Sequence, residues 1–203
     1  MRKLAKEVGV TAPAIYRHYD GREAVLADVL REAHRTFSRY LYAALGAPSP
    51  LERFMAAGEQ YLSFVLEHPR WYSIMHTAPE HLGMDSVPAD IEALQQATSQ
   101  FWHDRVRECM DAGILRRGDP EEASMTMWAH AHGMVQLFQQ GCLLAEPDEF
   151  RALFKASGRR LMMGVATPDF AAELERMAAE EAEGMAAEGV GVHAADMAGT
   201  GTS

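Results

Sequence analysis

The chain has 203 residues, of which 48% are hydrophobic, and this content suffices for one medium domain or for a small domain joined to a larger one. Its formal net charge of −10 argues against a nucleic-acid-binding protein when the chain is taken as a whole. The charges are unevenly distributed, however. Residues 1–39 carry eight Lys or Arg against five Asp or Glu, whereas the other residues carry 11 against 24. A basic end on an acidic body indicates that this end meets a polyanion.

Neither a signal peptide nor a membrane span is predicted. Met1-Arg-Lys leads directly into an amphipathic pattern, and no stretch approaches the ~18 apolar residues of a membrane helix. The two cysteines, Cys109 and Cys142, fall within apolar helical patterns, so we expect buried free thiols and no disulfide. We therefore expect a cytoplasmic protein without a membrane partner.

Two short helices are predicted at the N-terminus. The first has one apolar face and is broken by Gly9. Thr11 can cap the second, which tolerates Pro13 in its first turn because the missing N–H has no partner there. Ile15 and Tyr19 lie four residues apart and should point inward, which leaves polar side chains outside. A helix, a glycine-containing turn and a short polar second helix are typical of a helix-turn-helix, whose second helix enters the major groove of DNA.

The rest of the chain is also predicted as helix, because no stretch alternates with the period of two that strands show. We expect Asp20 to begin a long helix through a capping box with Glu23, and Ser49 to begin the next one with Glu52. Pro, Gly and Asp predict a loop over residues 77–88. The other expected helices cover about residues 70–76, 89–111, 120–140 and 147–166, with a last one from Pro168.

The stretch LAKEVGVTAPAIYRHYDGREAVL, residues 4–26, resembles the DNA-binding domain of TetR-family transcription regulators. The shared features are a Leu-Ala pair before the Gly-Val turn, the element Tyr16-Arg17-His18, Tyr19, and a basic residue three positions later. Trp128-Ala-His-Ala-His132-Gly133 is similar to the Trp-His-Gly signature of one subclass of TetR ligand domains. Family members carry another helix before this motif. Since the chain begins after it, we expect Leu4, Ala5 and Val8 to lack cover and the head to be loosened.

We interpret the chain as an all-α protein with three parts. Residues 1–40 form a helix-turn-helix DNA-binding head, with the motif itself in about residues 1–19. Residues 41–183 form a helical body for ligand binding and dimerisation, and residues 184–203 form a disordered tail, since they lack large apolar side chains apart from Met and Val. An ordinary amphipathic hairpin is the alternative reading of the N-terminus.

The predicted contacts with DNA all lie in the head. Ala12 and Ala14 let the backbone approach the bases and offer methyl groups to thymine. Tyr16 and His18 offer donors for phosphate oxygens, as does Arg22, which lies in the first turn of the long helix, where free amides favour anions. The complete predicted set is Arg2, Thr11, Ala12, Pro13, Ala14, Tyr16, Arg17, His18 and Arg22.

Aromatic and Met side chains of the body are too numerous for a plain helical core, although any one of them could be a core residue. We expect some of them to line a cavity, and the family resemblance implies a ligand pocket there. Arg105 or His132 is expected to supply the polar contact to a small, mostly apolar effector. The complete predicted set is Trp71, Tyr72, Met75, Phe101, Trp102, Arg105, Trp128 and His132.

No catalytic residue, metal site or cofactor is predicted. His130 and His132 are two residues apart and diverge on a helix, so they cannot share an ion. The sequence has neither a glycine-rich phosphate loop nor a nucleophile elbow. A helical small-molecule-binding protein or an enzyme using the pocket, without a competent DNA-binding head, is the alternative function.

The last two long helices carry more apolar side chains than one core face needs. Two such helices from each of two subunits would form a four-helix interface, so we expect a homodimer. The predicted interface residues are Met127, Met134, Phe138, Phe150, Phe154 and Leu161. The sequence thus predicts a ligand-responsive regulator of TetR type, a repressor that leaves its double-stranded DNA operator when it binds its effector.

Overall fold

The computed structural model of the chain describes residues 1–143, 146–176 and 179. Over these residues the protein consists of helices and their connections, with a single isolated bridge between Leu115 and Ala166. The all-α prediction is therefore confirmed. The tail predicted for residues 184–203 lies outside the described residues.

The helices follow one another with short connections. They are α1 (Arg2–Glu7), α2 (Ala12–Tyr16), α3 (Arg22–Ala43), the 3-10 turn η1 (Ala44–Gly46), α4 (Pro50–Glu67), α5 (Pro69–Met75), α6 (Pro79–Leu82), α7 (Ala89–Asp111), α8 (Pro120–Gln139) and α9 (Pro147–Val165). Residues 168–176 are helical as well.

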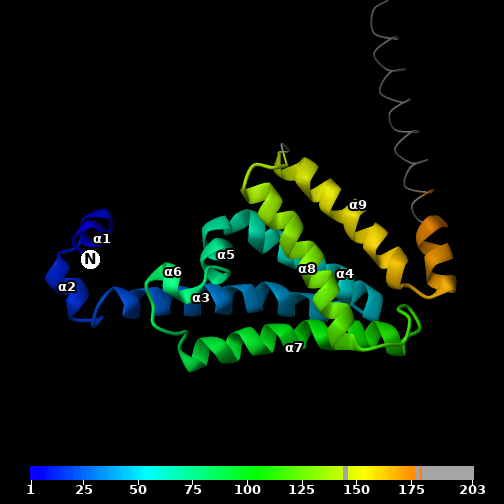
Figure 1. Cartoon of the computed structure of the whole chain (residues 1–203), viewed down its shortest axis with the longest axis horizontal. Helices are drawn as coiled ribbons and strands as arrows, with labels where there is room; N and C mark the ends of the chain where they lie inside the picture. The colour runs from blue at the N-terminus through cyan, green and yellow to red at the C-terminus, as the bar shows by residue number, and fades with distance from the viewer. Residues whose placement is uncertain (144–145, 177–178, 180–203) are drawn as a thin grey trace, which may run out of the picture.

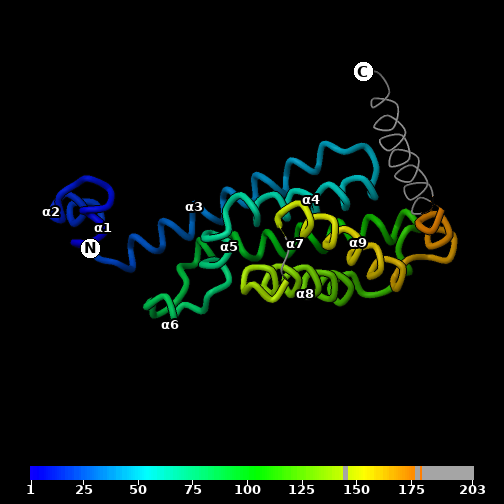
Figure 2. The backbone as a smooth tube through the Cα atoms, turned by 90° about the horizontal axis from the view of Figure 1, so that it is seen from above, coloured from blue at the N-terminus to red at the C-terminus, as the bar shows by residue number. Residues whose placement is uncertain are grey.

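The molecule is elongated, with a small head at one end and a larger helical body. Figure 1 shows α1 and α2 at the end of the molecule, from which α3 runs into the body. The view from above shows the same separation (Figure 2). Within the body α3 packs on α4 and α7, α7 packs on α8, and α8 packs on α9. Helix α3 thus belongs to both parts of the molecule.

Local capping explains where several helices begin. Ser49 forms the expected capping box: its Oγ accepts from Glu52 N at 3.2 Å, and Glu52 Oε2 accepts from Ser49 N at 3.0 Å. Proline follows the N-cap in α4, α8 and α9, where its missing N–H costs no hydrogen bond.

Two sequence predictions about the chain between these helices are wrong. Gly21, not Asp20, is the N-cap of α3, and no side chain caps that helix. Asp20 therefore lies one residue outside the position from which it could cap. The segment predicted as a loop over residues 77–88 contains α6, which begins with Pro79 and ends at Gly83, a glycine with φ of 73°.

The main core of the body lies between α3, α4, α5 and the last two helices. Phe64, Leu62 and Tyr72 are fully buried there. Burying an aliphatic or aromatic side chain of this size contributes ~1.5–3 kcal/mol. Cys109 is buried as expected, whereas Cys142 is exposed because it lies in the turn that follows α8. The prediction for Cys142 was therefore wrong.

The head buries much less than the body. Ala5 is the only buried residue of α1, and α2 has none. Leu4 and Val8 are exposed, as the sequence led us to expect, but Ala5 is covered. Few apolar contacts therefore hold the two head helices in place.

Candidate DNA-binding head and ligand cavity

The end of helix α2 and the two residues that follow it present polar side chains to solvent. Thr11 caps it through a hydrogen bond from Ala14 N to Oγ1 at 3.3 Å, which fixes where the helix begins. Tyr16, Arg17 and His18 follow at its C-terminal end, and all three are exposed. The donors of these three side chains are therefore accessible at the tip of the head.

Two side chains connect α2 to the chain around it, since Ile15 and Tyr19 are half-buried. Ala12 and Ala14 are also only partly exposed. The Tyr19 hydroxyl donates to the Asp28 carboxylate, and this hydrogen bond is the main reason why the pKa of Tyr19 is raised. The turn after α2 is thereby tied to the first part of α3.

Arg22 also makes a contact within the chain. Its Nη1 donates to the Leu82 carbonyl oxygen at 2.6 Å, so one side of its exposed guanidinium faces the end of α6. A Cβ on Gly83 would lie 2.7 Å from this nitrogen, so a side chain there would make the end of Arg22 shift. Arg22 is therefore a link between α3 and the body.

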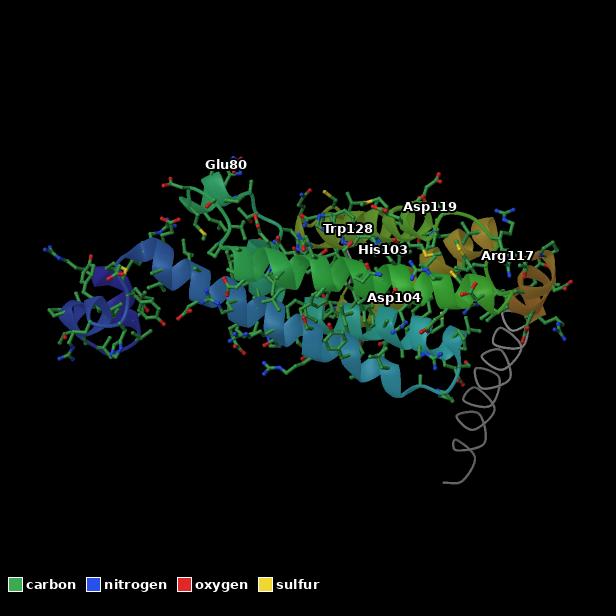
Figure 3. The ribbon with its side chains drawn as sticks, turned by 90° about the horizontal axis from the view of Figure 1, so that it is seen from below. Glu80, His103, Asp104, Arg117, Asp119 and Trp128 are labelled. Atoms are coloured by element: carbon green, nitrogen blue, oxygen red, sulfur yellow. The ribbon has the colours of Figure 1, made fainter. Side chains whose placement is uncertain are left out.

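A cavity of about 290 Å³ opens in the body between α3, α4, α5, α7 and α8. Figure 3 shows His103 on α7 and Trp128 on the neighbouring α8, two of its lining residues. The lining residues are His34, Phe37, Tyr61, Met75, His76, Gln95, Thr98, Ser99, Trp102, His103, Ser124, Met125 and Trp128. The size suits one small molecule.

Two family comparisons match most of the chain. Residues 1–29 match the bacterial regulatory proteins of the tetR family, and residues 54–161 match the tetracyclin repressor-like C-terminal domain. The second match alone covers more than half of the chain. The chain belongs to the TetR family. Its members are transcription regulators and not enzymes.

Solved structures share the fold of this TetR-family chain. A protein of unknown function from Rhodococcus sp. RHA1 is 24% identical with a TM-score of 0.67, over 82% of this chain and 84% of that one. The ketosteroid transcriptional regulator KstR2 of Mycobacterium tuberculosis is 14% identical with a TM-score of 0.64, over 82% and 84%. AibR, solved in complex with isovaleryl coenzyme A and operator DNA, is 18% identical with a TM-score of 0.63, over 79% and 85%. No curated protein sequence matches.

Three of the predicted ligand-binding residues of this TetR-family chain line the cavity, namely Met75, Trp102 and Trp128. The others lie elsewhere. Tyr72 is fully buried behind the wall, where its hydroxyl lies 2.6 Å from Tyr61 Oη and 2.6 Å from His132 Nδ1. This chain of hydrogen bonds ties the lining residue Tyr61 to α8.

Arg105 is a correction to the predicted site. Its guanidinium pairs with Glu108 at 2.7 Å and lies over the Phe101 ring, 5.1 Å from the centroid, so its charge is satisfied within α7. Neither Arg105 nor Phe101 lines the cavity. Trp71 stacks on His68, with centroids 4.9 Å apart, and stays outside the lining too.

Sequence reasoning missed His34, a lining residue on α3. Its side chain is only 5% exposed, and neither ring nitrogen has a hydrogen-bond partner. Burial and, to a smaller extent, the nearby His76 together lower the pKa of His34 to about 4. The only signal in the sequence is its position beside Ala33 and three residues before Phe37, on the apolar face of α3.

Two other histidines stand beside the cavity. Nδ1 of His76 donates to the Tyr72 carbonyl oxygen at 2.9 Å, since a carbonyl can only accept, and a neutral ring then keeps Nε2 as an acceptor. Although this ring is accessible from the cavity, loss of hydration lowers the pKa of His76. His132 stacks on Trp128 with centroids 4.9 Å apart and supports the lining from behind.

The outer face of α8 and α9 has exposed apolar side chains, but they are not the six residues predicted for the interface. Phe150 is fully buried and stacks on Phe138 at 4.1 Å, so it belongs to the core of its own chain. The other predicted interface residues are half-buried, namely Met127, Met134, Phe138, Phe154 and Leu161. Leu137 is 44% exposed and Leu153 38%, and neither is among the six predicted interface residues.

The described residues hold neither a candidate metal site nor a membrane-spanning helix. No group of three or more His, Cys, Asp or Glu there could hold a metal ion. No described helix is long and apolar enough to cross a membrane.

Proposed function

We propose that the chain is a ligand-responsive repressor that reads operator DNA through α2 and leaves it when a small molecule fills the cavity. One observation carries this proposal: α3 begins at the head and, three turns later, lines the cavity with His34 and Phe37. A single continuous helix therefore joins the two sites. In this proposal residues 1–40 serve as the head, and residues 41–183 as the body.

The segment between α5 and α7 provides a second connection. Met75 and His76 line the cavity before this segment, and Gln95 lines it afterwards. Between them, Leu82 accepts from Arg22, and Asp85 N donates to Glu23 Oε1 at 3.4 Å. A ligand that displaces the residues lining the cavity therefore changes the contacts that this segment makes with the start of α3.

An ion pair extends this connection along α3. Arg31 Nε lies 2.5 Å from Asp90 Oδ2 at the start of α7, and Arg31 also pairs with Asp28, the acceptor for Tyr19. The Asp90 carboxylate is thereby linked, through Arg31 and Asp28, to Tyr19 in the turn that follows α2. Such contacts can shift the head only if the ligand favours one of two arrangements.

The dimer is part of the same proposal. A pair of chains joined through α8 and α9 would hold two heads at a fixed spacing, which two operator half-sites require. Exposed Leu137 and Leu153 on these helices support this choice of face. AibR, whose structure holds both isovaleryl coenzyme A and operator DNA, supports the view that this fold can accommodate ligand and DNA.

Selection of bound DNA from a random pool, with the full chain, tests the proposal. We expect one enriched sequence, and its affinity is then measured by fluorescence anisotropy with and without compounds that raise the melting temperature of the protein. A true effector weakens DNA binding, and the same DNA weakens effector binding by the same factor. A selection without an enriched sequence, or a compound that binds in the cavity without changing DNA affinity, would contradict the proposal.

A further inference from the structure

The cavity combines polar side chains with an absence of formal charge. None of its described lining residues is Asp, Glu, Lys or Arg. More than half of them nevertheless have polar side chains, namely His34, His76, Gln95, Thr98, Ser99, His103 and Ser124. This composition differs from that expected for a mostly apolar effector.

Most of the hydroxyl donors on this wall are already used within their own helices. Ser124 Oγ donates to the Glu121 carbonyl oxygen at 3.0 Å, and Thr98 Oγ1 donates to the Leu94 carbonyl oxygen at 3.1 Å. Ser99 Oγ lies 3.4 Å from His103 Nε2. The hydroxyls of Ser124 and Thr98 can accept a hydrogen bond from a ligand, but their protons are engaged, whereas either partner can donate in the contact of Ser99 with His103.

His34 is different. Among the described lining residues, it alone has buried side-chain nitrogens without a partner. With a pKa of about 4 the ring is neutral near pH 7, so one nitrogen donates and the other accepts. Buried polar groups are nearly always hydrogen-bonded. A ligand hydroxyl, which can either donate or accept, would give one of the two ring nitrogens a partner.

These features together define a class of ligand. A carboxylate or phosphate would need a cation that the wall does not supply, and a buried charge without a partner is unfavourable. An organic cation could face the rings of Trp102 and Trp128, but it would leave the acceptors and donors of His34 unused. We propose that the cavity binds an uncharged aromatic molecule whose hydroxyl group hydrogen-bonds with His34. This inference rests on the proposed function, since it names the effector class.

Matched probes on one ring system test the class. Equilibrium dialysis of the full chain at pH 7.5 compares 2-naphthol with naphthalene, 2-naphthoate and 2-naphthyltrimethylammonium. We expect 2-naphthol to bind at least about tenfold more tightly than each of the others, since one good hydrogen bond is worth about that factor. Tighter binding of either charged probe, equal binding of naphthalene, or no binding of 2-naphthol would overturn the proposal.

Variants at His34 locate the interaction. His34→Phe keeps a ring and removes both nitrogens, so it should weaken 2-naphthol about tenfold and leave naphthalene unchanged. His34→Gln retains a donor and an acceptor and should recover part of the loss. The control is His81→Phe, at an exposed position on α6 outside the lining. A His34→Phe chain that is folded by circular dichroism and still binds 2-naphthol like the wild type would overturn the assignment.

The DNA readout separates this inference from the proposed function. If a charged compound fills the cavity and releases DNA, the ligand class is wrong and the proposed function stands. If 2-naphthol binds through His34 without changing DNA affinity, the ligand class stands and the proposed function fails.

Discussion

His34 makes the stability of the body depend on pH. Its pKa is about 4 in the folded chain, against ~6.5 for an unperturbed histidine. Between these two pH values the unfolded chain binds more protons than the folded chain, so the free energy of unfolding rises with pH. The contribution of neutral His34 to this free energy is therefore fully present above about pH 6.5 and is lost as the pH falls toward 4. The contribution is at most about 3 kcal/mol.

The prediction is checked by thermal unfolding between pH 4 and 7.5. The His34→Phe chain should lose less stability than the wild type as the pH falls, because the ring that must gain a proton is absent. His81→Phe, at an exposed position, should follow the wild type. Parallel curves for wild type and His34→Phe would show that another group causes the acid sensitivity.

Helix α2 should divide its side chains between positioning and reading. Arg17 and Tyr16 are exposed at its end, and we assign them to phosphates. Arg17→Ala should weaken binding to all DNA sequences alike, and the slope of log affinity against log salt should fall by the amount that one phosphate contact contributes. Tyr16→Phe should weaken DNA affinity about fivefold and leave this slope unchanged, because it removes a hydrogen bond but no charge. Changes at Ala14 should alter the preferred sequence instead. Competition between operator and random DNA measures all three, and a sequence-selective effect of Arg17→Ala would contradict the assignment.

The elements also show what the sequence could predict. Ser49 and Glu52 bond within one turn, so their capping box was readable from four residues. Helix α6 was missed because it is a single turn begun by Pro79, amid residues that usually form loops. His34 was missed because the cavity forms only where five helices leave space between them. The local sequence pattern of one helix does not predict where such a space lies. The fold and the head were therefore predictable, but most of the cavity wall was not.

The whole molecule should be a dimer through α8 and α9. Leu137→Glu places a charge on the exposed face of α8 and should convert the dimer to a monomer in sedimentation at micromolar concentration, with a large loss of operator affinity. Met55→Glu is the control, because Met55 is even more exposed, at 57%, but lies on α4. A wild-type chain that sediments as a monomer, or two variants that behave alike, would contradict this interface.

The close approach of Arg22 to Gly83 has a consequence for genetics. A side chain at Gly83 would meet the guanidinium 2.7 Å away, so Gly83→Ala should displace the end of Arg22 and break its hydrogen bond to Leu82 even when the cavity is empty. In cells where this regulator silences a reporter gene, such mutants should express the reporter without inducer. Gly113 has the same φ of 73° and open space around it, so Gly113→Ala carries the backbone strain alone and should leave the reporter silent. A screen for constitutive colonies would then recover substitutions at position 83 and not at position 113.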